Sequence, residues 1–237
     1  INWFAGYTKM RASDIFELTS AQSESSYGRS VRADGENITA ARSNFMVEHK
    51  FISSLDYTTQ LFGNNDTRFS LVYVRKSGEP YSVTFDGYDD AFANDRSDGG
   101  YDAAYVPTGA SDPNVVFASS AVADTVMAHV NSSGLASYKG QIVPRNAFNS
   151  PWMSSLDLRI TQDINVMDGH KVILYLDITN VLNLIDDNKG IMREYSNRSR
   201  QIILDSDNPY DSQGRYNIVG VDPDDGLYVI NKDGQSS

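Results

Sequence analysis

Three histidines are the residues most able to bind a metal or to act in acid–base chemistry, but the sequence keeps them apart. His49, His129 and His170 lie in separate segments, and none has a second histidine or a carboxylate at a ligand spacing such as HExxH. Cysteine is absent, and no GxSxG elbow, GxGxxG loop or Walker loop occurs. Thiol catalysis, acyl transfer, dinucleotide binding and nucleotide hydrolysis therefore lack support, and we expect neither an enzyme nor a cofactor.

Two acidic clusters carry the oxygen ligands that calcium prefers. The first is DSDNPYDSQG, with Asp205, Asp207 and Asp211, and the second is DPDDG, which begins at Asp222. Neither has the spacing of an EF-hand, because Pro and Tyr stand in the first cluster where a ligand and the sharp-turn glycine are needed. We expect solvated turns and no metal site, and the three aspartates of the first cluster are the calcium candidates.

The most informative polar residues alternate with aliphatic residues in two adjacent segments, 153–166 and 170–183. Successive side chains of a strand point to opposite faces, so each segment has one apolar and one polar face. The apolar set is Leu156, Leu158, Ile160, Val172, Leu174, Leu176 and Ile178. The polar set is Asp157, Arg159, Asp163, Lys171, Tyr175 and Asp177. What each face contacts is the question that decides the function.

The same two-residue alternation predicts five strands. They lie near 1–10, 45–63, 66–87, 153–166 and 170–183, with an interruption in the third near 77–80. Short turns, one of them ending in Asp168-Gly169, alternate strictly with long polar connections at 11–44, 88–152 and 184–237. This alternation is typical of an outer-membrane barrel, which has short periplasmic turns and long outward loops.

One long connection is predicted to contain a short helix. The segment SSAVADTVMAHVNSSG offers Ser120 as a cap, Val122, Val126 and Val130 at four-residue spacing, and Gly134 as a stop. We interpret the valine stripe as local packing within the loop. Aromatic residues near the predicted strand ends suit an interfacial girdle, where an amphipathic ring lies at the depth of the lipid headgroups. These aromatic residues are Trp3, Phe4, Tyr81, Phe148 and Trp152.

The composition restricts the partners. The 237 residues carry a net charge of -11, and no cluster of Lys and Arg suggests phosphate contacts, so we expect no binding to nucleic acid. No apolar run reaches the length of a transmembrane helix. Strands of a transmembrane barrel need only alternate apolar residues, so a membrane location is compatible with this sequence.

Four stretches resemble a known family. RNAFNSPWMSSLDLRITQDI, followed after a short turn by HKVILYLDITNVLNLIDDNKG, resembles the C-terminal barrel region of TonB-dependent outer-membrane receptors. SLVYVRKSGEPYSVTFDG and YVPTGASDPNVVF resemble the Oar-like branch of that family. The resemblance implies a bacterial outer-membrane protein that takes up a solute through a barrel closed by an N-terminal plug, with energy passed on by TonB.

On this reading, residues 1–237 are the C-terminal part of such a barrel. The fold class is all-β, an antiparallel up-and-down sheet with long extracellular loops that contain a short helix. The apolar set would face outer-membrane lipid, and the polar set would face the lumen. No plug, TonB box or final aromatic strand occurs here, so the expected partners are the remainder of the receptor, TonB through the missing plug, and an unknown solute.

Two other readings remain open. The chain could be a secreted β-sandwich module that binds a ligand, for example a carbohydrate, through surface Tyr and Trp. That reading requires two packed sheets about 10 Å apart. The chain could also be a complete small barrel of about eight strands, which needs three more strands than the sequence pattern offers.

Overall fold

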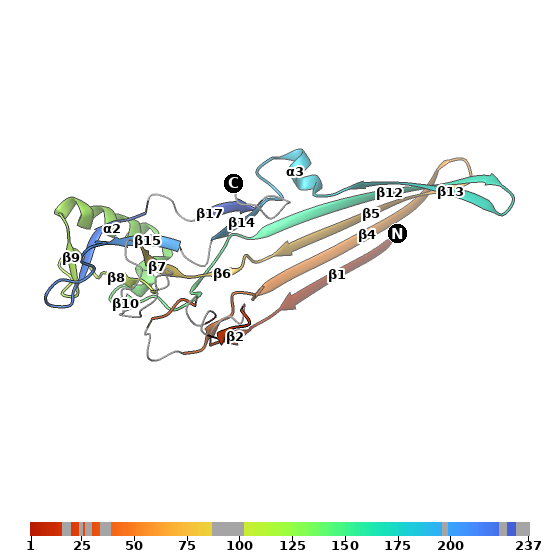
Figure 1. Cartoon of the computed structure of the whole chain (residues 1–237). Coiled ribbons are helices and arrows are strands. Elements are labelled where there is room, and N and C mark those ends of the chain that lie inside the picture. The colour runs from red at the N-terminus through yellow and green to blue at the C-terminus, as the bar shows by residue number, and fades with distance from the viewer. Residues whose placement is uncertain are drawn as a thin grey trace.

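Five long strands form one antiparallel sheet, which we call the main sheet. A computed structural model of the chain describes residues 1–15, 20–23, 26, 30–33, 39–86, 102–195, 199–222 and 227–230. The strands of the main sheet are β1 (Asn2–Lys9), β4 (His49–Phe62), β5 (Asn65–Lys76), β12 (Met153–Met167) and β13 (His170–Ile178), in the order β1-β4-β5-β12-β13 (Figure 1). All four pairings are antiparallel. The five predicted strands and their antiparallel sheet are thus confirmed.

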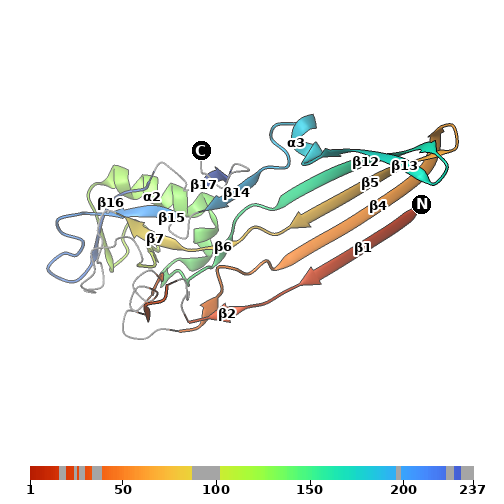
Figure 2. The same cartoon turned by 45° about the vertical axis from the view of Figure 1, so that its right-hand side comes forward.

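The two ends of the main sheet differ. At one end, β4 joins β5 and β12 joins β13 through tight turns that contain Gly63 (φ 63°) and Gly169 (φ 78°). A positive φ is the conformation that glycine adopts without the steric penalty of a Cβ atom. The long connections gather at the opposite end, and the N-terminus lies near the turns (Figures 1 and 2).

Two predicted strands end earlier than the sequence pattern suggested. The predicted strand 66–87 leaves the main sheet after Lys76, where Gly78 packs so closely on the backbone of Ser150 that a Cβ would collide with it. The predicted strand 170–183 ends at Ile178, and its NVLN segment is the start of a short helix, α3 (Val181–Ile185), instead of a strand end. Asn180 causes this change of direction, because its φ of 56° is left-handed and its side-chain amide donates to the Gly190 carbonyl at 2.9 Å.

The long connections contain secondary structure of their own. A four-stranded sheet, which was not predicted, has the order β7-β15-β16-β9, and its β7–β15 and β16–β9 pairings are parallel. Its strands are β7 (Val83–Asp86), β9 (Val115–Phe117), β15 (Ser199–Leu204) and β16 (Tyr216–Gly220). Four two-stranded pairs surround it: β2 (Ser13–Asp14) with β3 (Ala41–Arg42), β6 (Pro80–Tyr81) with β11 (Phe148–Asn149), β8 (Tyr105–Val106) with β10 (Gln141–Ile142), and β14 (Met192–Tyr195) with β17 (Leu227–Ile230).

The predicted helix is present as α2 (Ser120–Ser132), and a 3-10 helix follows at Gly134–Tyr138. The N-cap is Ser119, whose Oγ accepts from the Val122 amide at 3.2 Å, and is not Ser120 as the sequence suggested. The elements β7, β8, β9, α2, β15 and β16 pack together, and we call this part of the molecule the loop region. Val126 and Val130 are completely buried in its core. The valine stripe therefore serves local packing, as predicted.

This loop region has a hydrophobic core, whereas the main sheet has none. The core joins β7, β8, β9, α2, β15 and β16, and its largest members are Phe85, Leu135, Ile202, Leu204 and Ile218. Burial there raises the pKa of Tyr216 to about 12. Every buried apolar side chain of the described residues lies outside the five strands of the main sheet. No described helix is long and apolar enough to cross a membrane.

The core of the loop region should be sensitive to cavities. Phe85→Ala removes a ring that is 1% exposed and packs on Tyr216 at 5.0 Å between ring centroids. We expect a loss of about 3–5 kcal/mol from the stability of this region, measured by denaturant unfolding. Phe62→Ala, at a ring that is 66% exposed beside the turn, is the control and should change little. An equal effect of the two substitutions would contradict the assigned core.

Asp112 predicts how this region responds to acid. Burial alone raises the pKa of its carboxyl, but hydrogen bonds from the amides of Thr108 (2.7 Å) and Asn114 (2.8 Å) outweigh burial and lower the pKa below the ordinary 3.8. A lowered folded-state pKa contributes stability above pH 3.8, which is lost as the pH falls through the folded-state pKa. Asp112→Asn should reduce this loss of stability at low pH, measured as the free energy of unfolding against pH. If the loss at low pH were the same in the variant, Asp112 would not be its source.

Candidate functional site

The strand register separates the residues of the main sheet into two chemically different faces. Leu158, Ile160 and their partners Ile178 and Leu176 lie on one side, which we call the apolar face. Arg159 and its partner Asp177 lie on the other side, which we call the polar face. All seven predicted apolar residues share the apolar face, and all six predicted polar residues share the polar face, as the register requires.

A row of polar side chains crosses four strands on the polar face. Asp56, Ser70, Arg159 and Asp177 are consecutive partners on β4, β5, β12 and β13. Ser70 Oγ donates to Asp56 Oδ1 at 2.5 Å, and Arg159 donates to both carboxylate oxygens of Asp177, at 2.5 and 2.8 Å. The Arg159 guanidinium also lies 5.7 Å from the centre of the Tyr175 ring. Polar contacts thus connect the residues of this row in pairs.

A second group of charges lies on the same face nearer the turns. Asp163 Oδ2 accepts from Arg68 at 3.3 Å and from Lys171 at 3.1 Å, and the Asp163 side chain is only 9% exposed. Asp157, at the other end of β12, accepts from the backbone amide of Asn180 at 2.8 Å. Most charges of the polar face are therefore neutralised by neighbours in the sheet.

The predicted polar set did not include the residues that β4 and β5 contribute to this face. Asp56, Arg68 and Ser70 alternate with apolar residues in their own strands, and the short turn at Gly63 fixes their register. Extending the alternation across that turn would have placed them opposite the predicted residues. Pairing across β5 and β12 could not be found in this way, because 76 residues or more separate those strands in the chain.

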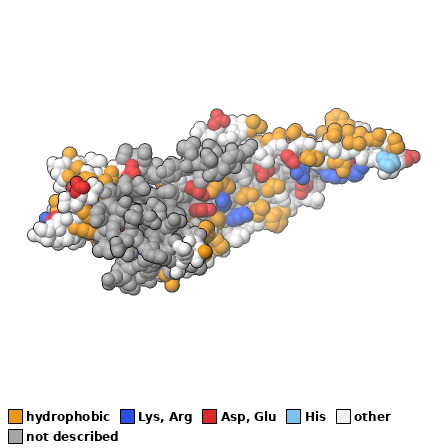
Figure 3. Space-filling view, in the orientation of Figure 1, with side chains coloured by type: hydrophobic (Ala, Val, Ile, Leu, Met, Phe, Trp, Pro, Cys, Tyr) orange, Lys and Arg blue, Asp and Glu red, His pale blue; other side chains and the backbone are white. Residues whose placement is uncertain are grey.

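The apolar face carries no carboxylate. Its only residues with a permanent charge are Lys9 and Arg75, both at the end of the sheet near the loops. Figure 3 shows hydrophobic side chains along the main sheet together with acidic and basic ones, so this view includes the polar face. Leu174 at the middle of β13 is 55% exposed. No described part of the chain covers this face with a second layer.

An aromatic cluster closes the apolar face at the loop end. Tyr7 and Phe51 lie 4.6 Å apart between ring centroids, His49 and Phe51 lie 5.9 and 6.3 Å from Trp152, and Tyr7 Oη contacts His49 Nδ1 at 2.8 Å. Arg75 stacks on Trp152 at 5.4 Å. Tyr7 and Phe51 were missed because they lie inside strands in the sequence, and only the register brings them level with Trp152.

Of the five aromatic residues predicted for an interfacial girdle, only two lie on the apolar face of the main sheet. Trp3 and Trp152 lie on the apolar face, but the register places Phe4 on the polar face. Tyr81 and Phe148 lie outside the main sheet, in β6 and β11, where their rings pack 5.6 Å apart against the core of the loop region. Proximity to a predicted strand end therefore did not predict on which sheet, or on which face of it, an aromatic side chain lies.

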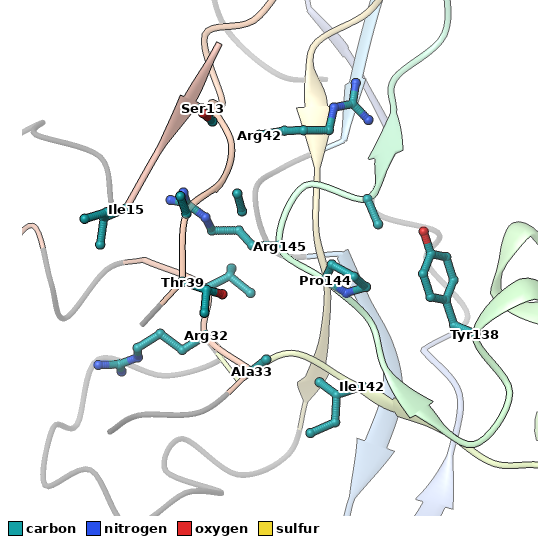
Figure 4. Close-up of a pocket in the computed structure, with 14 residues that line it drawn as sticks. Ser13, Ile15, Arg32, Ala33, Thr39, Arg42, Tyr138, Ile142, Pro144 and Arg145 are labelled. Atoms are coloured by element: carbon teal, nitrogen blue, oxygen red, sulfur yellow. The ribbon is translucent and has the colours of Figure 1, made fainter. Parts of the chain in front are cut away.

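A cavity of about 630 Å³ lies within the loop region. The residues that line it come from 13–15, 31–33, 39–42 and 138–147 (Figure 4). Its size is that of a small-molecule site. Its arginines point in different directions in Figure 4: Arg145 binds Asp14 at 2.5 Å, and Arg42 binds Asn149 at 2.5 Å. The cavity thus does not present a converging charge.

Two of the three calcium candidates, Asp205 and Asp211, accept hydrogen bonds within their own turns, and the third, Asp207, is exposed. Asp205 accepts from the amides of Asp207 and Asn208, at 2.9 and 3.1 Å. Asp211 accepts from the amide and side chain of Arg215, and these contacts lower the pKa of the Asp211 carboxyl. Among the described residues, no three His, Asp or Glu side chains come together as a metal site, and the rest of the second acidic cluster, at 223–226, lies outside the described residues.

Asp163 tests the polar face. Asp163→Asn removes the charge that Arg68 and Lys171 share, and we expect a loss of about 1–3 kcal/mol in unfolding experiments, because two cations lose their common acceptor. Asp168→Asn is the control, since Asn-Gly forms this type of turn as well as Asp-Gly. If both substitutions had the same effect, the charged group around Asp163 would not contribute to stability.

No protein-family model, curated protein or solved structure matches this chain. The resemblance to TonB-dependent receptors therefore depends on the sequence stretches alone. The features of the molecule that bear on its function are the two faces of the main sheet and the loops at its end.

Proposed function

We propose that this chain is a wall segment of an outer-membrane receptor that takes up a solute in a TonB-dependent manner. The apolar face of the main sheet contacts lipid, and the polar face lines a water-filled lumen. The loop region forms the outer surface that selects the solute. The observation that carries this proposal is an apolar face without carboxylates that the described chain leaves uncovered.

The dimensions of the strands support a membrane location. A transmembrane β-strand needs about 9–11 residues. The four strands β4, β5, β12 and β13 have 14, 12, 15 and 9 residues. Strands of globular proteins have about 5–6 residues on average, and a soluble single-layer sheet gains nothing from such length. Tight turns at one end and all long connections at the other agree with the topology of outer-membrane barrels.

The open edges of the sheet support the expected partners. β1 and β13 are the two edges, and neither pairs with a further strand among the described residues. Unpaired backbone groups are costly in hydrocarbon, so a membrane-embedded sheet must close on itself. Five strands cannot close a barrel, for which about eight are needed. Further strands of the same receptor would complete the wall, and a plug inside it would connect to TonB.

A β-sandwich binding module has less support. A sandwich buries the apolar face of one sheet against a second sheet about 10 Å away. The described residues place no second sheet on the apolar face of the main sheet, and the four-stranded sheet belongs to the loop region at its end (Figure 1). Cell fractionation distinguishes these two hypotheses. A wall segment requires detergent for extraction from membranes, and a secreted module does not.

Adjacent residues of β13 provide a matched test. Leu174→Arg places a charge on the apolar face and should cost roughly 2–4 kcal/mol of folding stability in lipid if it lies near the midplane. Ile173→Arg, at a neighbouring residue of similar exposure (47%) on the polar face, should be tolerated, because Asp163 is its partner across the strands. Stability is measured by urea unfolding in vesicles. Equal costs for the two variants would exclude a lipid-facing apolar side.

A further inference from the structure

A second cavity, of about 380 Å³, lies beside the aromatic cluster at the loop end of the apolar face. Tyr73, Trp152 and Ser154 form one wall, and the other wall is formed by Leu182 of α3, Lys189 of the following loop and Arg193 of β14. The cavity is thus continuous with the apolar face through Tyr73 and Ser154, which belong to that face by register. Neither wall belongs to the cavity of Figure 4.

The charged residues that line this cavity are both positive. Lys189 and Arg193 line it, Arg75 lies over the Trp152 ring at its edge, and no carboxylate is among its lining residues. Asp186 approaches Lys189 at 3.5 Å from outside the lining. Such a cluster is unusual in a chain of net charge -11, where acidic residues outnumber basic ones by 31 to 20. It favours an anionic ligand.

We propose that this cavity binds the phosphate-bearing headgroup of a membrane lipid, with the acyl chains lying along the apolar face. The inference rests on the proposed function. Arginine presents a fork of donors that matches phosphate oxygens, and Lys189 adds a point charge. Trp152 and Tyr73 provide amphipathic rings at headgroup depth.

Continuity with the apolar face favours a lipid over a free anion. A soluble anion would gain nothing from Leu182, Ile191 and the exposed aliphatic residues that extend from the cavity toward the turns. An anionic lipid uses both parts, because its headgroup meets the cations while its chains cover the apolar face. Basic pockets at the boundary of a membrane recognise lipids in this way.

Trp152 is a built-in reporter, since its side chain is 45% exposed at the edge of the cavity. The complete gene product is reconstituted in vesicles of phosphatidylcholine to which brominated phosphatidylglycerol or brominated phosphatidylcholine is added. Bromine quenches tryptophan at contact, and subtracting the signal of Trp152→Phe isolates this residue. We expect phosphatidylglycerol to quench Trp152 at a lower mole fraction than phosphatidylcholine.

The cations should account for this preference. Arg193→Gln and Arg75→Gln should each lower the relative binding constant of phosphatidylglycerol about fivefold, the effect of one basic residue near a membrane surface. Lys50→Gln, on the polar face at the same end of the sheet, is the control and should leave the preference unchanged. Equal quenching by both lipids, or a preference that survives both arginine substitutions, would overturn the lipid site and leave the proposed membrane wall intact. Absence of quenching by either lipid would overturn the membrane wall itself.

Discussion

The structure depends on one constraint: a single layer of five strands has an apolar face that the described chain does not cover. Apolar surface of this extent is unfavourable in water, and monomeric soluble proteins rarely expose it. All buried apolar side chains of the described residues lie outside the main sheet, so the sheet has no core of its own. In the proposed receptor, hydrocarbon on the apolar face and water on the polar face would stabilise the sheet.

The polar face is organised by pairing across strands. Arg159 with Asp177, and Arg68 and Lys171 with Asp163, connect β5, β12 and β13. The exposed Arg159–Asp177 pair contributes little stability, so its main effect is on register, whereas the Asp163 carboxylate is nearly buried between its two cations. A slip of one residue would move every charge to the opposite face. In a membrane, that exchange would place carboxylates in lipid. A one-residue slip would therefore cost much more free energy there than in water.

The two ends of the sheet have different physical roles. Glycines with positive φ close the strands at one end with as few residues as possible, whereas the connections at the other end build a packed region around Phe85, Leu135 and Ile218. A core of its own gives the loop region a defined shape, and in the proposed receptor this region would select the solute. The aromatic cluster and the basic cavity lie where this region meets the apolar face, so both proposals concern the same boundary.

The sequence by itself determined the strands, their two faces, the turns and the helix, because alternation, Gly-containing turns and valine spacing are local signals. It correctly assigned Leu174 and Asp177 to opposite faces before any pairing was known. Only the tertiary structure decided that 83–86 leaves the main sheet, that Asn180 turns the chain into α3, and that Tyr7, Phe51 and Trp152 form one cluster. Those outcomes depend on contacts between residues that are distant along the chain, such as Gly78 with Ser150, and local periodicity does not encode such contacts.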